Sequence, residues 1–421
     1  MAKKRDEKPR REVTKRQLSH WQQQRKKQRI VFSVGAFIIA SVLVVIGVGW
    51  YVSRYQPLHQ TVIKVNDVEF NMNYYIKMLR FYGKDQSVEY RHYLADKVVQ
   101  RIERDELIRQ GAMKLGISVS DDEVKNELKS RELPLSRDYR DLVGVELLVG
   151  RLLDEYFDKQ VPRFAEQRHI MAMFLESKGQ AMEVGDRLEN EEDFGELAGE
   201  LSLDGFSKNE NGDLGWHPKD ILTDLLASPK PGDYAFSAEV GTLSEPIYDE
   251  DKFKGVGYWL IEVLEKDEEP DEAHVQAMLL GSEEEALQVK SRLEAGEDFA
   301  TLAEEYSQYE YSDEEAGDLG WLSPGEMSLV FDEFVFNSEL ELETLSEPIR
   351  DDAAPTKGGY WLVKVLDEDD NKEIGKDDRD FLKAQVFNEW LSSLWDDPEN
   401  QIDSYLDGEQ KAWAVEQSMK G

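Results

Sequence analysis

The pattern of apolar and polar positions divides the chain into stretches of different character. Residues 30–52 form an apolar run without a single charge. Between residues 60 and 165 the apolar positions recur at helical spacing, and a similar pattern returns at 372–398. The intervening part alternates short strand-like runs with amphipathic segments. The pattern therefore predicts an α+β protein with one membrane-spanning helix, a helical domain and a strand-containing region.

The apolar run is long enough to cross a bilayer, because 23 helical residues span about 30 Å of hydrocarbon. Trp50 and Tyr51 lie at its far end as interfacial aromatics, and a cluster of Lys and Arg precedes it. Basic flanks stay in the cytoplasm, so we expect residues 1–29 to be a cytoplasmic arm and the body to lie outside. The alternative is a cleaved signal peptide, but the run exceeds the usual length and no Ala-x-Ala site follows.

The region 60–165 also carries helix boundary signals. Gly116 follows a helical pattern and is placed to end that helix. Ser120 and Glu123 form a capping box at the start of the next helix. The later helix at 372–398 has two tryptophans, which we expect to be buried against the helices of 60–165; residues 399–421 are left as a tail.

An internal repeat occupies the middle of the chain. Gly-Asp-Leu-Gly-Trp occurs at 212–216 and again at 317–321, an offset of 105, and Gly-Tyr-Trp recurs at 257–259 and 359–361. We name residues 166–265 repeat 1 and residues 272–367 repeat 2, and we expect each to form a small α+β domain. The acidic stretch between them reads as a solvated linker, with a calcium site as the alternative.

Composition and charge narrow the chemistry. The chain has no cysteine, which excludes disulfides, thiolate metal sites and cysteine nucleophiles. Residues 1–30 carry a net charge of +9, whereas the rest carries −46, so we expect no nucleic-acid binding by the body. The six histidines show no metal-ligand or triad spacing, and no cofactor or metal is expected. Carboxylates are so abundant that a pair suited to glycoside hydrolysis is a weak signal.

Taken together, these spaced motifs resemble extracytoplasmic foldases of the SurA/PrsA/PpiD type, with tandem parvulin (PpiC-type) peptidyl-prolyl isomerase domains. The helical part is similar to their chaperone domain through Val65-Asn66-Asp67 and the segment 107–124. The repeats are similar to parvulins through the Asp298-Phe-Ala-Thr-Leu-Ala303, Gly-Asp-Leu-Gly-Trp and Leu-Ser-Glu-Pro motifs. The resemblance covers about residues 60 to 395 and implies a chaperone domain, two parvulin-like domains and a returning C-terminal helix.

The resemblance also implies site residues, several of which depart from the family. The first family histidine falls on Ala172 and Ala277, and the second on Trp259 and Trp361. Because His169 and His274 lie three residues earlier in each strand, we expect them on the opposite face, unless the register is slipped. The family Cys or Asp position falls on Asp204, a candidate catalytic residue, and on Tyr309.

The proline cup is implied at Leu319, Met327 and Phe331 in repeat 2, and by the same offset at Leu214, Leu222 and Leu226 in repeat 1. Ordinary core packing is the alternative for all six positions.

The resemblance thus implies a protein that binds unfolded or proline-containing segments of exported proteins and isomerises prolyl bonds. The replaced histidines favour a second interpretation, a non-catalytic holdase whose repeats act as peptide clamps. A cell-surface scaffold without affinity for unfolded chains is a more distant alternative.

Overall fold

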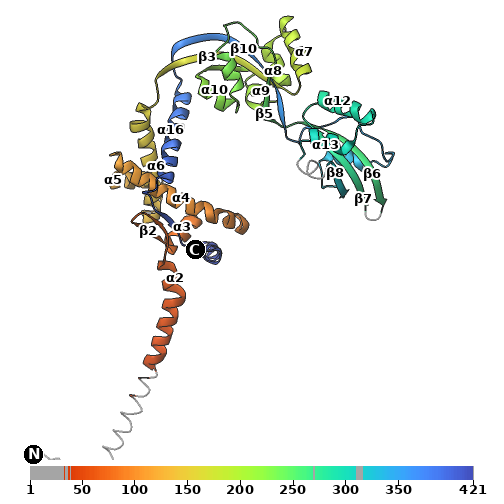
Figure 1. The fold of residues 1–421 in the computed structure, drawn as a ribbon. Coiled ribbons are helices and arrows are strands. Elements are labelled where there is room, and N and C mark those ends of the chain that lie inside the picture. Colours follow the sequence, from red (N-terminus) through yellow and green to blue (C-terminus); the bar gives the residue numbers. More distant parts are fainter. Residues whose placement is uncertain (1–32, 34–36, 38, 269–270, 310–315, 421) are drawn as a thin grey trace, which may run out of the picture. The chain divides into compact units, whose positions relative to one another are not determined.

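A computed structural model describes residues 33, 37, 39–268, 271–309 and 316–420. The chain divides into two compact units, which we describe separately (Figure 1). Unit 1 comprises Met1–Phe157 and Gln385–Gly421, and unit 2 comprises Asp158–Ala384.

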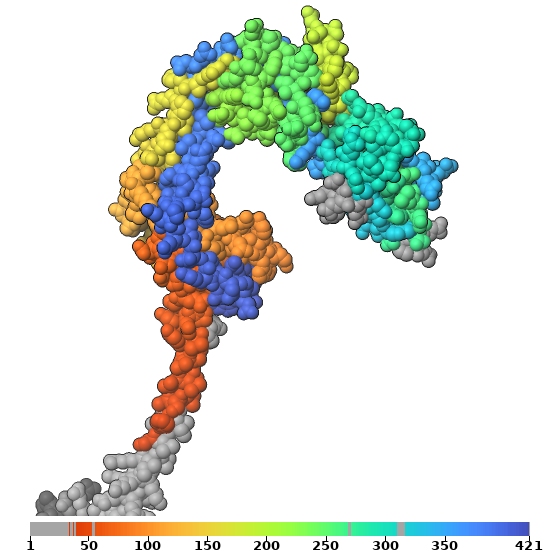
Figure 2. All heavy atoms as spheres, viewed as in Figure 1, coloured from red at the N-terminus to blue at the C-terminus, as the bar shows by residue number. Residues whose placement is uncertain are grey.

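The apolar N-terminal segment is helical over residues 39–50, followed by a π-helical turn at Tyr51–Tyr55 and the short helix α2 at Gln56–His59. Its large side chains are exposed, and the segment is coloured red-orange in Figure 2. Within the described residues, no helix combines the length and apolar character needed to cross a membrane. The first part of the predicted span 30–52 and the basic arm 1–29 lie outside the described residues.

The core of unit 1 combines a small sheet with helices. The hairpin β1 (Thr61–Val65) and β2 (Val68–Asn71) leads into α3 (Met72–Tyr82), α4 (Val88–Lys114), α5 (Asp121–Ser130) and α6 (Arg137–Arg151). Ser120 and Glu123 form the expected capping box before α5, and Gly116 has a positive φ of 74° after α4. The stretch 399–421, expected as a tail, instead forms β11 (Ile402–Ser404), which pairs with β1, and α17 (Gly408–Met419).

Helix α16 (Lys376–Asp396) extends into unit 1, where it packs on the helices. Phe387 is buried in one cluster with Ile108 and Phe157, and Trp390 is packed against it. A Cβ atom on Gly111 of α4 would meet the Trp390 ring at 2.6 Å, so this glycine permits the close approach of the two helices. The C-terminal helix thus contributes to the core of the helical region.

Unit 2 contains two sheets of four strands. The first has the order β4-β3-β10-β5, formed by β3 (Phe164–Leu175), β4 (Asp213–His217), β5 (Ile247–Lys254) and β10 (Thr356–Glu373). Its helices are α7 (Lys178–Glu189), α8 (Phe194–Leu201), α9 (Gly205–Asn209), α10 (Lys219–Leu225) and α11 (Lys230–Ala235). We name this body module 1.

The second sheet has the order β8-β7-β6-β9. Its strands are β6 (Gly257–Glu268), β7 (Asp271–Leu280), β8 (Asp318–Leu322) and β9 (Ile349–Asp351), with helices α12 (Glu283–Glu294), α13 (Phe299–Tyr306) and α15 (Leu329–Val335). We name this body, residues 257–351, module 2.

The two repeats exchange their last strands. β6, the last strand of repeat 1, pairs with β7 and β9, whereas β10, the last strand of repeat 2, pairs with β3 and β5. The pairing therefore differs from the sequential boundaries 166–265 and 272–367, because module 2 is inserted between β5 and β10 of module 1. Both repeats carry Leu-Ser-Glu-Pro-Ile and Gly-Tyr-Trp, so either last strand can complete either sheet.

The connection between the repeats favours this exchange. The described residues of the acidic stretch expected as a linker, 265–268 and 271–272, belong to β6 and β7, where Glu265 pairs with His274 and Glu268 with Asp271. A short hairpin closes at low entropic cost, so β7 follows β6 into the same sheet. The stretch connects the two repeats and its described acidic side chains are exposed or partly exposed, as expected of a solvated linker, but its described residues continue the two strands.

Side chains secure the points where the chain crosses between modules. The Lys254 ammonium donates hydrogen bonds to the carbonyls of Lys357 and Gly358, and the Thr356 hydroxyl donates to the Val256 carbonyl at 2.5 Å. Lys254 is fully buried, and burial lowers its pKa to about 8. The buried Lys254 side chain therefore holds the end of β5 to the start of β10.

Candidate functional site

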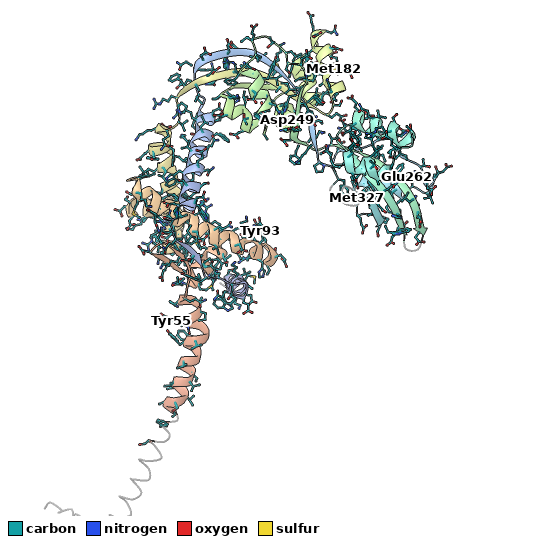
Figure 3. All side chains as sticks on the ribbon, in the orientation of Figure 1. Tyr55, Tyr93, Met182, Asp249, Glu262 and Met327 are labelled. Atoms are coloured by element: carbon teal, nitrogen blue, oxygen red, sulfur yellow. The ribbon has the colours of Figure 1, made fainter. Side chains whose placement is uncertain are left out.

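Module 2 carries an aromatic cluster on the face of its sheet that α15 covers, at the position where the resemblance implies the proline cup; we name this cluster the module 2 pocket. The Trp259 indole lies 5.1 Å from the rings of both Tyr309 and Phe331, each in an edge-to-face arrangement. The Tyr309 hydroxyl points at the Met327 sulfur over 3.5 Å. Phe331 is buried, whereas Tyr309 and Met327 are partly exposed, so the edge of the cluster formed by Tyr309 and Met327, which we name its rim, is accessible. Met327 is labelled in Figure 3.

The remaining predicted residues of this pocket lie in the same cluster. Ala277 is fully buried on β7, and Leu319 is a partly buried neighbour on β8. The structure thus brings together Leu319, Met327, Phe331, Ala277 and Tyr309 in one cluster.

The corresponding pocket of module 1 is filled. Ala172, Leu214, Leu222, Leu226 and Trp361 are all buried in one cluster. The ring centroids of Trp361 and Phe174 lie 4.8 Å apart. The three leucines of repeat 1 are at most 4% exposed, which favours the core-packing alternative for them.

Asp204 lies at the edge of this filled pocket. It is only 5% exposed, and its Oδ2 lies 3.5 Å from the Lys252 ammonium. The same ammonium donates to the Leu226 carbonyl at 2.6 Å and lies 5.5 Å from the Trp361 ring centroid. The Oδ1 atom of Asp204 is buried and has no hydrogen-bond partner among the described residues. The candidate catalytic carboxylate is therefore held inside module 1, paired with a lysine.

Strand exchange corrects the assignment of the two tryptophans. Trp361 was expected in the pocket of repeat 2 and Trp259 in that of repeat 1. The structure places Trp259 with Tyr309 and Phe331, and Trp361 with Phe174, because β6 and β10 each complete the sheet of the other repeat.

The histidines lie where the strand period predicts. The Nε2 atom of His169 is 2.6 Å from Asp213, and that of His274 is 2.8 Å from Asp318. Each imidazole also lies against the tryptophan of a Gly-Asp-Leu-Gly-Trp motif. Ala172 and Ala277 face the buried clusters instead, so the histidines occupy the opposite face of each strand.

Sequence reasoning missed a repeated serine–aspartate–tryptophan arrangement. In module 2, Oδ2 of Asp351 accepts hydrogen bonds from the Trp259 indole at 3.0 Å and from the Ser328 hydroxyl at 2.5 Å. Burial raises the pKa of Asp351, but hydrogen bonds from Ser328, the Ala353 backbone and Trp259 outweigh burial and lower it. The carboxylate thus stays ionised while it orients the tryptophan that forms the pocket wall.

Module 1 repeats this arrangement. Asp249, labelled in Figure 3, accepts from Trp361 at 2.9 Å and from Ser228 at 2.5 Å. Both aspartates stand two residues after a Leu-Ser-Glu-Pro-Ile motif. A comparison of polar residues between the two repeats could have identified both aspartates from this shared position.

Unit 1 has its own hollow of about 480 Å³ between α4, α5 and α6. Val124 and Leu148 form a buried apolar floor, and Met113 is exposed at the rim. Arg137 and Arg140 contribute charge to its walls. A concave surface with an apolar floor can accept apolar side chains of another polypeptide.

Comparisons with known proteins identify two kinds of domain. A PPIC-type PPIASE domain matches residues 169–265 and again 260–367, and a SurA-like N-terminal domain matches residues 21–134. The chain is therefore a protein of the parvulin foldase class. It belongs to the SurA/PrsA-like family, with a SurA-like N-terminal domain and PpiC-type parvulin domains.

Individual relatives show the extent of the similarity. The foldase protein PrsA of Geobacillus kaustophilus is 37% identical over 99 residues, 24% of this chain and 33% of that protein. The chaperone SurA of Pseudomonas fluorescens is 31% identical over 276 residues, 62% of this chain and 56% of that protein. The chain thus spans about a third of that PrsA and just over half of that SurA. A solved PrsA peptidylprolyl isomerase from Bacillus anthracis covers 83% of this chain and 96% of its own at 13% identity, with a TM-score of 0.25, too low to support any conclusion.

Proposed function

We propose that this protein is a membrane-anchored, extracytoplasmic foldase that binds unfolded segments of exported proteins and isomerises prolyl bonds in module 2. The single observation that supports activity in module 2 is its accessible rim of Tyr309 and Met327 over the buried wall of Trp259 and Phe331. The hollow between α4, α5 and α6 supports a separate binding site for unfolded chains in unit 1.

Prolyl isomerisation requires binding rather than bond cleavage. Rotation about the amide has a barrier of about 18–20 kcal/mol, because the twisted amide loses its resonance. A pocket that holds the proline ring against aromatic walls and removes water from the carbonyl favours the twisted form over the planar one. Trp259 and Phe331 supply such walls, and the Tyr309 hydroxyl is a polar group beside them. No acid or base is needed for this contribution.

A proline-limited refolding assay tests this activity on the full chain. We expect Met327→Gln to slow catalysis at least fivefold, because a polar amide replaces an apolar rim group. Met182→Gln is the matched control, since Met182 is an exposed methionine on α7, outside the pocket (Figure 3). Equal rates for Met327→Gln and the parent would exclude module 2 as the site of isomerisation.

A second candidate function is a holdase whose modules clamp peptides without catalysis. Tryptophans in place of the family histidines and the filled pocket of module 1 favour it. The same refolding assay separates the two functions, because a clamp suppresses aggregation of a denatured model protein without accelerating the proline-limited phase.

The anchor and the location are part of the proposal. The charge-free run 30–52, its basic flank and the exposed apolar side chains of residues 39–50 support insertion in a bilayer. We expect protease added outside intact cells to digest the body beyond about residue 60 and to spare the N-terminal arm. Full protection of the body would contradict the extracytoplasmic location.

A further inference from the structure

A second concave surface lies in unit 1, apart from the hollow described above. A groove of about 520 Å³ lies between α4 and α16, lined by Lys97, Gln100, Arg101, Arg104, Leu391, Ser392 and Trp395. The α4 residues stand at i, i+3, i+4 and i+7, so they form one stripe along the helix. The α16 residues supply an apolar wall, on which Trp395 is 38% exposed. We name this surface the α4–α16 groove.

The cations of the groove are held in place. Arg101 and Arg104 both bond the Asp105 carboxylate, at 3.3 and 3.0 Å, and their side chains remain about a third exposed. Lys97 lies 6.0 Å from the ring centroid of Tyr93 (Figure 3), a weak cation–π contact that leaves its ammonium at the surface. The single negative charge of Asp105 thus orients the guanidinium groups of Arg101 and Arg104. It does not neutralise the three positive charges of Lys97, Arg101 and Arg104.

Most of the net charge of −46 beyond residue 30 belongs to unit 2, because residues 53–157 of unit 1 carry 17 basic and 18 acidic side chains. An anionic partner is therefore repelled by unit 2 and attracted to clustered cations such as those of the groove. The stripe from Lys97 to Arg104 spans about 10 Å, the length of about three residues of extended polypeptide. Trp395 and Leu391 beside it suit an aromatic or aliphatic side chain.

We propose that the α4–α16 groove binds acidic segments of unfolded polypeptides that also carry an aromatic side chain. The carboxylates pair with Lys97 and the two arginines, and the aromatic ring packs on Trp395. This inference rests on the proposed chaperone function and adds a preference for acidic segments among its clients.

The test measures binding of two fluorescein-labelled peptides to the full chain in nanodiscs of zwitterionic lipid. One peptide alternates Glu and Phe, and the other has Lys in place of every Glu. We expect the acidic peptide to bind at least tenfold more tightly than its basic counterpart, with affinity falling as salt is raised. Lys97→Gln combined with Arg101→Gln should weaken acidic-peptide binding at least tenfold. Lys84→Gln with Lys129→Gln removes the same charge from exposed positions outside the groove and should not.

Three further results bear on the proposal. Trp395→Ala should weaken binding of the Glu/Phe peptide but not of a Glu/Ser peptide, which isolates the aromatic contact. Equal loss of affinity in the groove variant and the control variant would overturn the proposal. A groove variant that loses only its binding to anionic vesicles would also overturn it, because the groove would then be a lipid site. If suppression of aggregation of a neutral client persists while acidic-peptide binding is absent in the parent chain, the groove inference fails and the proposed function stands.

Discussion

The exchange of last strands between the repeats makes a prediction that four cysteine pairs can test. The chain has no cysteine, so introduced pairs meet no competing thiol. In the exchanged arrangement Met171 lies opposite Lys364, and Gln276 lies opposite Glu262. In a sequential arrangement the partners would be reversed, Met171 with Glu262 and Gln276 with Lys364. All four side chains are partly exposed and accessible to an oxidant.

Residues directly opposite on antiparallel strands have Cα atoms about 4.5–5.5 Å apart, within the range that a disulfide spans. We therefore expect cysteines at 171 and 364, and at 276 and 262, to cross-link on mild oxidation. The 171–364 bond closes a loop of about 190 residues, which restricts the unfolded chain and corresponds to a stabilisation of about 5 kcal/mol in the chain-entropy treatment. The 276–262 bond closes a loop of about 15 residues, corresponding to about 3 kcal/mol.

The assay combines peptide mass spectrometry of the oxidised protein with urea unfolding in the presence and absence of reductant. The two reversed pairs are matched controls, because they use the same four positions and the same substitutions. Rapid cross-linking of 171 with 262 and of 276 with 364, without the exchanged pairs, would refute the strand exchange and restore the sequential boundaries of the repeats.

Three other predictions follow from described contacts. Unfolding returns the pKa of the buried Lys254 from about 8 to its ordinary 10.5, so the unfolded state binds more protons between these pH values. The free energy of unfolding should therefore rise by about 3 kcal/mol from pH 8 to 10.5. Urea unfolding midpoints of the parent should show this rise relative to Lys254→Met. Gly359→Ala should cost about 1–3 kcal/mol, since its methyl group would meet a phenylalanine ring atom at 2.5 Å, whereas Gly255→Ala, with open space around it, should leave the melting temperature nearly unchanged. Ala277→His with Trp259→His places two imidazoles in the pocket of module 2 and should raise the isomerisation rate about tenfold, equivalent to about 1.4 kcal/mol of barrier; a folded double variant with no gain would contradict the assignment of these positions.

Local patterns in the sequence predicted the elements that depend on neighbouring residues. The capping box of Ser120 and Glu123 and the helix end at Gly116 are set within one turn of chain, and both are found as expected. The faces of the strands were equally predictable, because a period of two places Ala277 and His274 on opposite sides. Motif spacing also identified Met327 and Phe331 as neighbours.

The partners of Trp259 and Trp361 could not be predicted, because they depend on pairing between segments far apart in sequence. The two repeats share their last-strand motifs, so the local sequence does not distinguish the exchanged from the sequential pairing. The burial of the module 1 pocket could not be predicted from the sequence either, since it depends on how Phe174 and Trp361 pack in three dimensions. Asp249 and Asp351 were hidden among 88 acidic residues until their tryptophan partners were known.

The strand pairings are nested along the sequence. β1 pairs with β11 near the C-terminus, β3 pairs with β10 inside that span, and module 2 lies innermost. During synthesis from the N-terminus, module 2 is the first of the three sheets to have all its strands, at residue 351. Module 1 must wait for β10, and the sheet of unit 1 must wait for β11. A chain truncated after residue 351 therefore lacks strands of the sheets of module 1 and unit 1. The order of synthesis thus favours folding of module 2 before those two sheets.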